Sequence, residues 1–308
     1  MSDSATSIGL RAIVDARVHL YEGAGHAYPH FKRPNPTLKT GLGDYSALPK
    51  MYVPEAYKDD TQGYKVDGIV WHGIVTDDTL EETRWAQRLA DTSPIPQAIV
   101  ARVDFLNPIL ESQLERFQDL RNLTALGTQV GSNITHPQRD LTGRSDLFID
   151  PTWTRSIALL RKYNYKCVLE ASSLQLKELL AVVSQHPNVG FTLAVMGWPQ
   201  VLDTRGFAMW WKDIKALSFC ENVVADISAI ECIFGMDWTC TKIAPWVLSL
   251  IEIFGPSRCM FGSHLPAARL SHGFTRLYDV YEHLVSNFSA TEQDQMFRRV
   301  ALHWFGVR

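Results

Sequence analysis

Two residues with chemically useful side chains stand two positions apart in the first apolar run of the sequence, IVDARVHLYEG (residues 13–23). If this run is a β-strand, Arg17 and His19 share one of its faces, because successive side chains alternate between faces. The guanidinium of Arg17 is always cationic and offers forked donors to a carboxylate or to a developing oxyanion. The imidazole of His19 titrates near neutrality and can act as an acid or a base. The pair therefore indicates acid–base chemistry on a substrate that carries a carbonyl or carboxylate group.

Further candidates stand in or near the ends of other apolar runs. His264 is expected to share acid and base duties with His19, and Asp226 or Glu170 is expected to orient an imidazole or to serve as a base. With Arg17, four other residues are candidates for substrate binding: His72, Asp104, Trp198 and Tyr45.

These side chains need a fold that brings distant runs together, and the sequence contains eight short apolar runs separated by segments with helical spacing. The runs cover residues 12–20, 67–75, 97–105, 123–131, 165–172, 189–197, 222–230 and 258–266. Mostly apolar strands that alternate with helices require buried parallel pairing, and the economical closure of eight such units is a (β/α)₈ barrel. An open doubly wound sheet is the competitor, but no glycine-rich turn follows the first run. In the segment after the second run, Thr79 and Glu82 have the capping-box spacing, which predicts Thr79 as the helix N-cap.

One connection is unusually long. About forty residues (22–62) follow the first run without strong periodicity and are rich in Pro, Gly and Tyr. Loops of this length are usually disordered or functional, and the aromatic content argues against disorder. Because the loop follows the carboxyl end of a strand, it is expected to lie over the face where barrel active sites form. The sequence thus predicts one domain, residues 1–308, with residues 22–62 as a lid over the substrate.

Composition excludes several classes of protein. Thirty Lys and Arg against 33 Asp and Glu give a net charge of −3, and no dense basic run is present to match a nucleic-acid backbone. No basic and apolar leader and no apolar stretch of about 18 residues is found, so a soluble cytoplasmic protein without membrane contact is expected. The five scattered cysteines read as reduced thiols. The expected partner is a small-molecule substrate, and a homodimer is left open.

Several segments resemble the lactonase-like branch of the amidohydrolase superfamily, which includes pyrone-dicarboxylate lactonase and the sugar-acid lactonases. The similarity covers nearly the whole chain. The segments are IVDARVHLYEG, AYPHF, YVPEAY, TLEETRWAQRLAD, VARVDF, LFIDPTWTRSIALLRKY, HPNVGFTLAVMGWP, ENVVADISAI and IFGPSRCMFGSHLP. The resemblance implies a (β/α)₈ barrel of the metal-dependent-hydrolase type, in agreement with the strand count.

The resemblance also implies a set of metal ligands that this chain has largely replaced. Members carry two histidines spaced by one residue on the first strand, where this chain has Arg17 and His19. The ligand histidine of the sixth strand is matched by Val195, and the catalytic aspartate or asparagine of the eighth strand by His264. On the seventh strand, Asp226 stands where lysine is frequent. Because Arg17 repels a cation and an isopropyl group cannot bind one, the inherited metal site is expected to be lost.

Two kinds of chemistry remain. No metal or other cofactor is expected, and some lactonases of the family are thought to work without a metal; the preferred function is metal-independent hydrolysis of a lactone or ester of a small carboxylate-bearing metabolite. The alternative cofactor is one divalent metal such as zinc, held by His19, His264 and either Asp226 or Glu170. Alternative functions are a non-hydrolytic acid–base reaction (cyclisation, isomerisation or decarboxylation) and a catalytically silent binding protein.

The same residues also have structural interpretations. Arg17 can be a core cation neutralised by Asp15, or can pair with Asp226 and Glu170, because a buried arginine needs a carboxylate partner. His264 can simply cap a loop.

Overall fold

Eight parallel strands form one sheet in this computed structural model, which describes residues 11–23, 28–133 and 140–307. The strands are β1 (Ala12–Val18), β4 (Lys65–His72), β5 (Ala98–Arg102), β6 (Leu123–Gln129), β7 (Lys166–Glu170), β8 (Phe191–Leu193), β9 (Val223–Ile227) and β10 (Cys259–Phe261). Their spatial order follows the chain order, and each neighbouring pair is parallel. The predicted (β/α)₈ barrel is therefore confirmed, with every strand shorter than the apolar run that predicted it.

The barrel closes where the first strand meets the segment after the last one. Val18 forms a parallel bridge with Leu265, and the backbone N–H of His264 donates to the carbonyl of Arg17 at 2.9 Å. Gly262 permits this approach, because a Cβ atom at that position would lie 2.9 Å from the backbone nitrogen of Arg17. Closure thus brings His264 next to the Arg17–His19 segment, although the two lie at opposite ends of the sequence.

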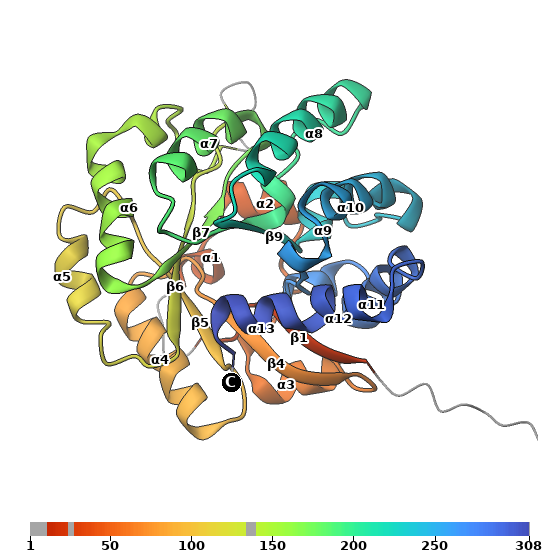
Figure 1. Ribbon diagram of the computed structural model, residues 1–308. Helices are drawn as coiled ribbons and strands as arrows, with labels where there is room; N and C mark the ends of the chain where they lie inside the picture. The colour runs from red at the N-terminus through yellow and green to blue at the C-terminus, as the bar shows by residue number, and fades with distance from the viewer. Residues whose placement is uncertain (1–10, 24–27, 134–139, 308) are drawn as a thin grey trace, which may run out of the picture.

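Helices surround the strands, as Figure 1 shows, and α1 (Pro29–Lys32) and α2 (Pro36–Leu42) are seen inside that ring. The larger helices are α4 (Thr79–Thr92), α6 (Pro151–Tyr163), α7 (Leu176–Gln185), α8 (Thr204–Ser218), α10 (Cys240–Phe254) and α11 (Gly273–Leu284). The shorter ones are α5 (Leu110–Glu115), α9 (Ile230–Phe234), α12 (Ala290–Asp294) and α13 (Val300–Phe305). Among the described residues, no helix is long and apolar enough to cross a membrane.

The first turn of α4 corrects one local prediction. The N-cap is Asp78, whose carboxylate accepts the backbone N–H of Glu81 at 3.0 Å, and Thr79 is the first helical residue. The capping-box prediction was wrong because Glu82 does not turn back to the cap. Its side chain is fully buried and accepts the backbone N–H of Ile74 at 3.3 Å.

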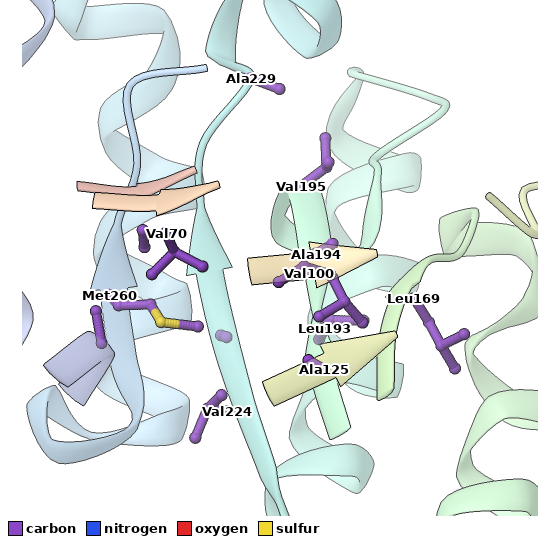
Figure 2. Close-up of a cluster of buried hydrophobic side chains, with 14 of the residues drawn as sticks. Val70, Val100, Ala125, Leu169, Leu193, Ala194, Val195, Val224, Ala229 and Met260 are labelled. Atoms are coloured by element: carbon purple, nitrogen blue, oxygen red, sulfur yellow. The ribbon is translucent and has the colours of Figure 1, made fainter. Parts of the chain in front are cut away.

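Aliphatic side chains from the strands fill the barrel interior. Val70, Val100, Leu169 and Met260 belong to one buried cluster, in which each is at most 2% exposed. Figure 2 shows Val195 and Ala229 beyond the carboxyl ends of β8 and β9, at one end of this cluster. The interior below the mouth is therefore packed, and polar chemistry is confined to the carboxyl ends of the strands.

The long connection after β1 has more regular structure than its sequence suggested. Its described residues include β2 (Tyr21–Glu22) paired antiparallel with β3 (Met51–Tyr52), and the helices α1 (Pro29–Lys32), α2 (Pro36–Leu42) and α3 (Pro54–Asp60). The proline at the start of each helix explains the short elements, since proline favours the first helical turn. Short proline-initiated helices leave too few turns for a visible hydrophobic period.

Candidate active site

A cavity of about 180 Å³ opens at the carboxyl ends of the strands. The polar side chains that line it are His19, His30, Asn35, Arg102, Gln129, Glu170 and His264. Most of the remaining wall is apolar: Leu38, Leu42, Leu48, Ile74, Val75, Leu141, Val195, Trp198, Ala229, Pro266 and Ala267. His30, Asn35 and three of the leucines belong to residues 22–62, so this segment supplies part of the cavity wall, and its role as a lid stays a prediction.

A buried ion-pair cluster lies beside this cavity. The Nε of Arg17 donates to Asp226 at 2.8 Å, and its Nη1 donates to Glu170 at 2.9 Å. The side chains of Arg17 and Asp226 are 2% and 1% exposed, so solvent screens neither charge appreciably. Although burial opposes the charge of Arg17, the two carboxylates outweigh it and raise the pKa of the guanidinium. Likewise, burial works against the Glu170 carboxylate, but Arg17 and Arg102 outweigh it and lower its pKa.

Arg17 and Asp226 do not line the main cavity. Arg17 lines only a small space of about 20 Å³, together with His72, Arg102 and Glu170. The contacts of Arg17 are therefore those of a core cation paired with Asp226 and Glu170. The expectation that its guanidinium contacts the substrate directly is corrected, because it lies outside the main cavity wall. Arg17 binds one oxygen of each carboxylate, and among the described residues neither carboxylate is hydrogen-bonded to an imidazole.

Asp15 is not the partner of the Arg17 side chain. Its carboxylate accepts the backbone N–H of Ser263 at 2.7 Å and the hydroxyl of Tyr57 at 3.0 Å, and it meets only the backbone N–H of Arg17, at 3.4 Å. Complete burial raises the pKa of Asp15 to about 6 in spite of these donors. Asp15 therefore holds the closing segment of the barrel against β1 and α3.

His19 is held as a neutral imidazole with one nitrogen free for chemistry. Its Nδ1 donates to the carbonyl oxygen of His72 at 2.8 Å, since a carbonyl can only accept. Burial, followed by electrostatic interaction with His264 and Arg17, lowers the pKa of His19 well below its ordinary value. In this tautomer Nε2 carries a lone pair, and it can accept a hydrogen bond in the cavity.

His72 lies beside His19 and supports it through its backbone carbonyl. Its Nε2 donates to the carbonyl of Ala16 at 3.0 Å, and burial together with the charge of Arg17 lowers the pKa of the ring well below the ordinary value. Its side chain does not line the main cavity. His72 therefore fixes the carbonyl that orients His19, and its predicted contact with substrate is corrected to an indirect role.

His264 forms a carboxylate–imidazole pair. Its Nδ1 lies 2.5 Å from Oε1 of Glu231, a carboxylate that is 1% exposed, whereas the imidazole is 16% exposed. The rings of His264 and His19 meet edge to face with their centroids 5.1 Å apart. Glu231 fixes the ring so that Nδ1 is the donor and Nε2 remains available. The two candidate catalytic histidines are thus brought together as predicted, and the carboxylate that orients one of them is Glu231.

Three site residues escaped the sequence analysis: Glu231, Arg102 and Gln129. Arg102 and Gln129 are the last residues of β5 and β6, and the Nη2 of Arg102 donates to the Gln129 side chain at 2.8 Å. Arg102 lines the main cavity and so takes the place expected of Arg17. A polar residue that ends an apolar run at the barrel mouth is a signal that could have found both. Glu231 stands in α9 after β9, where no such signal is present.

The three remaining residues predicted to bind substrate lie in different places. Trp198 lines the main cavity, as expected. Asp104 is exposed, lines an adjacent cavity and accepts the backbone N–H of Leu106 at 2.8 Å. The hydroxyl of Tyr45 accepts the backbone N–H of Asn35 at 2.6 Å and is not part of the cavity wall, so its expected contact is corrected to support of a lid residue.

Strained backbone marks the mouth. Val195, Met196 and Trp198 follow β8 with φ of 54°, 56° and 30°, and Ala229 and His264 follow β9 and β10 with φ of 53° and 60°. Left-handed backbone is costly for non-glycine residues, above all for a β-branched valine, and such strain concentrates at functional sites. The predicted strand 189–197 therefore ends early, and the turn directs Val195 and Trp198 to the cavity wall.

The inherited metal site does not fit the residues present. Arg17 occupies the space between Asp226 and Glu170, and Val195 offers no ligand atom. Among the described residues, the one group of three potential ligands within 4.8 Å of each other is Glu231, Cys232 and His264. Two of these groups, Glu231 and His264, are already paired with each other, and burial raises the pKa of the Cys232 thiol well above its ordinary value. The predicted rebuilt site of His19, His264 and Asp226 or Glu170 does not form such a group among the described residues, and it stays a prediction.

The ion-pair cluster gives a first prediction. Arg17→Met should lower the free energy of unfolding by about 3–5 kcal/mol, because it leaves two carboxylates buried without a cation. The triple variant Arg17→Met, Glu170→Gln, Asp226→Asn should recover much of this loss, since it removes the unpaired charges as well. Urea unfolding at pH 7 measures both. A single variant as stable as the wild-type protein would contradict the assigned role.

Glu82 gives a second prediction, on pH. Burial raises its pKa to about 8, so the folded protein keeps a proton that the unfolded chain loses above pH ~4.5. The stability contributed by this proton is complete below the unfolded pKa and is lost as the pH rises through 8, at up to about 1.4 kcal/mol per pH unit. Glu82→Gln removes this dependence, so the variant should gain stability relative to wild type between pH 5 and 8. Urea unfolding across this range tests it, with the exposed neighbour changed by Glu81→Gln as the control; a difference that is constant with pH would refute it.

Comparison with known proteins agrees with the barrel fold described above. An uncharacterized protein (y4mH) of Sinorhizobium fredii is 25% identical over 298 residues, which is 96% of this chain and 99% of that protein. A Burkholderia multivorans amidohydrolase with bound zinc has a TM-score of 0.79 at 19% identity and covers 97% of this chain and 100% of its own. A probable 2-pyrone-4,6-dicarboxylic acid hydrolase of Acinetobacter baumannii has a TM-score of 0.71 at 12% identity, over 96% and 99% of the two chains. At these identities the solved structures share the fold. Residues 14–307 match the Amidohydro_2 family, and the chain therefore belongs to the amidohydrolase family of enzymes.

Proposed function

We propose that this enzyme is a metal-independent hydrolase that opens a lactone or ester, with a water molecule as the nucleophile. One observation carries the proposal: two imidazoles with different hydrogen-bond partners face each other across 5.1 Å at the cavity. His19 donates to a carbonyl and His264 to a carboxylate, and both therefore have Nε2 free. Two such nitrogens can accept the two O–H groups of one water molecule.

His264 is the general base of the proposed reaction. As the water attacks the substrate carbonyl, one of its protons moves to Nε2 of His264, and the buried Glu231 carboxylate balances the charge that the ring acquires. His19 stays neutral and accepts the second O–H, because burial and two neighbouring cations disfavour its charged form. The pair thus divides the work between proton transfer and orientation.

Arg102 stabilises the oxyanion in this proposal. Its guanidinium lines the cavity, and the bond from its Nη2 to Gln129 fixes its direction. Burial lowers the pKa of Arg102, and the negative charge of Glu170 opposes this effect. When the tetrahedral intermediate collapses, the bond between the carbonyl carbon and the ester oxygen breaks, and that oxygen takes the proton from His264. The product is a hydroxy acid, whose new carboxylate also suits Arg102.

The apolar cavity wall limits the substrate. Leu38, Leu42, Ile74 and Val195 bound most of the space, and Trp198 offers an aromatic surface. The volume of about 180 Å³ suits a single ring. The proposed substrate therefore presents a compact apolar or aromatic ring that carries the reactive carbonyl.

The test is hydrolysis in oxygen-18 water. Protein dialysed against a chelator is incubated with dihydrocoumarin and a panel of aliphatic lactones, and mass spectrometry follows the product carboxylate. One heavy oxygen should enter each product, with a rate that chelation does not change. His264→Ala and Glu231→Gln should each lower kcat by on the order of 10²-fold or more, since both disable the general base.

The exposed His283 on α11 supplies the matched control, and His283→Ala should keep the wild-type rate. Turnover without heavy oxygen would replace hydrolysis by a non-hydrolytic acid–base reaction. A protein that binds lactones but turns none over, with the same affinity in His264→Ala, would be a binding protein, and the proposal would fail.

A further inference from the structure

A second chamber adjoins the cavity that holds the two histidines. Its volume is about 350 Å³, and it lies over the ends of β5 and β6 and the start of α4 and α6. Four residues line both spaces: Val75, Arg102, Gln129 and Leu141. The two chambers are therefore adjacent, and the Arg102–Gln129 pair stands between them.

The second chamber differs from the first in chemistry. Its wall includes the carboxylate of Asp104 and the guanidinium of Arg144. Four threonines also line it: Thr76, Thr79, Thr128 and Thr142. The first chamber has no threonine in its described wall and is bounded mainly by leucine, isoleucine and valine. Hydroxyl groups can both donate and accept hydrogen bonds, so this wall suits a ligand rich in oxygen atoms.

The Arg144 guanidinium of the second chamber is already compensated within the protein. It pairs with Asp146 at 2.8 Å and with Asp150 at 2.9 Å. Asp104 accepts the backbone N–H of Leu106. With Arg144 doubly neutralised and Arg102 set at the junction with the first chamber, the remainder of this wall favours an uncharged polar group over a carboxylate or phosphate.

An unused donor also belongs to this wall. Trp153 lines the chamber, its side chain is 1% exposed, and its indole Nε1 has no acceptor among the described residues. A buried donor without an acceptor is costly, and buried indole N–H groups usually have a partner. Because Nε1 of Trp153 is itself buried, a ligand oxygen reaches it only with a small shift of the chamber wall.

From these contacts we infer that the second chamber binds an uncharged polyhydroxylated group, such as a glycosyl unit, joined to the ring that the first chamber holds. This inference rests on the proposed function for the identity of the first chamber's ring, and it deepens that function by making the substrate a two-part molecule. Arg102 and Gln129 would then lie beside the bond that connects the two parts.

A binding experiment tests the inference separately from catalysis. Isothermal titration calorimetry compares phenyl β-D-glucoside with phenol, which has the ring alone. The wild-type protein should bind the glucoside at least about tenfold more tightly. Thr128→Val, which replaces a hydroxyl by a methyl group of similar size, and Trp153→Phe, which removes the N–H donor, should each weaken glucoside binding several-fold.

The same change elsewhere on β6 is the control. Thr124 lies on that strand outside both chambers, so Thr124→Val should keep the wild-type affinity for the glucoside. Equal wild-type affinities for glucoside and phenol would overturn the inference, as would tighter binding of phenyl β-D-glucuronide, which would show an anion site. Because binding needs no turnover, failure of lactone hydrolysis would refute the proposed function alone.

Discussion

The guanidinium of Arg17, held between Asp226 and Glu170, is the interaction on which the rest of the mouth depends. Three charges lie within a few ångströms of each other in a part of the barrel that water scarcely reaches. Either carboxylate alone would carry a large desolvation penalty, and the single cation offsets both. The cluster joins β1, β7 and β9 across the barrel, and it gives the mouth a fixed internal charge.

This arrangement explains the unusual division of labour among the other residues. Arg17 is committed to two carboxylates. The guanidinium that lines the main cavity is that of Arg102, at the end of β5. The positive charge of Arg17 also helps to keep His19 neutral, whereas His264, beyond it, has its own carboxylate in Glu231. Left-handed backbone follows β8, β9 and β10 at the mouth. Such backbone costs conformational free energy, and folded proteins retain this strain mainly at functional sites.

Local patterns predicted much of the fold. Eight apolar runs and their helical separators sufficed for the barrel, because burial of parallel strands leaves a simple apolar signature. The helix over residues 79–92 was also predicted, but its cap was misplaced by one residue, since Glu82 is drawn into the interior instead of returning to the N-terminus. The early end of β8 could not be predicted, because a left-handed valine contradicts its own propensity and exists only through tertiary contacts.

The candidate site was also predicted only in part, because local patterns do not reveal long-range contacts. Alternation along a strand placed Arg17 and His19 together, and barrel closure brought His264 to them. Which carboxylate serves which cation is a long-range property: Asp15, Glu170 and Asp226 are equivalent in sequence terms, and only the packed barrel assigns the last two to Arg17. Glu231 stands on a short helix after β9, and no period in the sequence reveals that it meets His264.

We propose that a compensated arginine cluster, with acid–base histidines, replaces metal chemistry in this barrel. Elemental analysis of protein purified without chelator, reported as moles of Zn, Mn, Fe, Co and Ni per chain, tests this proposal most directly. Metal contents well below stoichiometric are expected. About one tightly held metal per chain that disappears in His264→Ala and Cys232→Ser would contradict it, because the mouth would then hold a rebuilt metal centre.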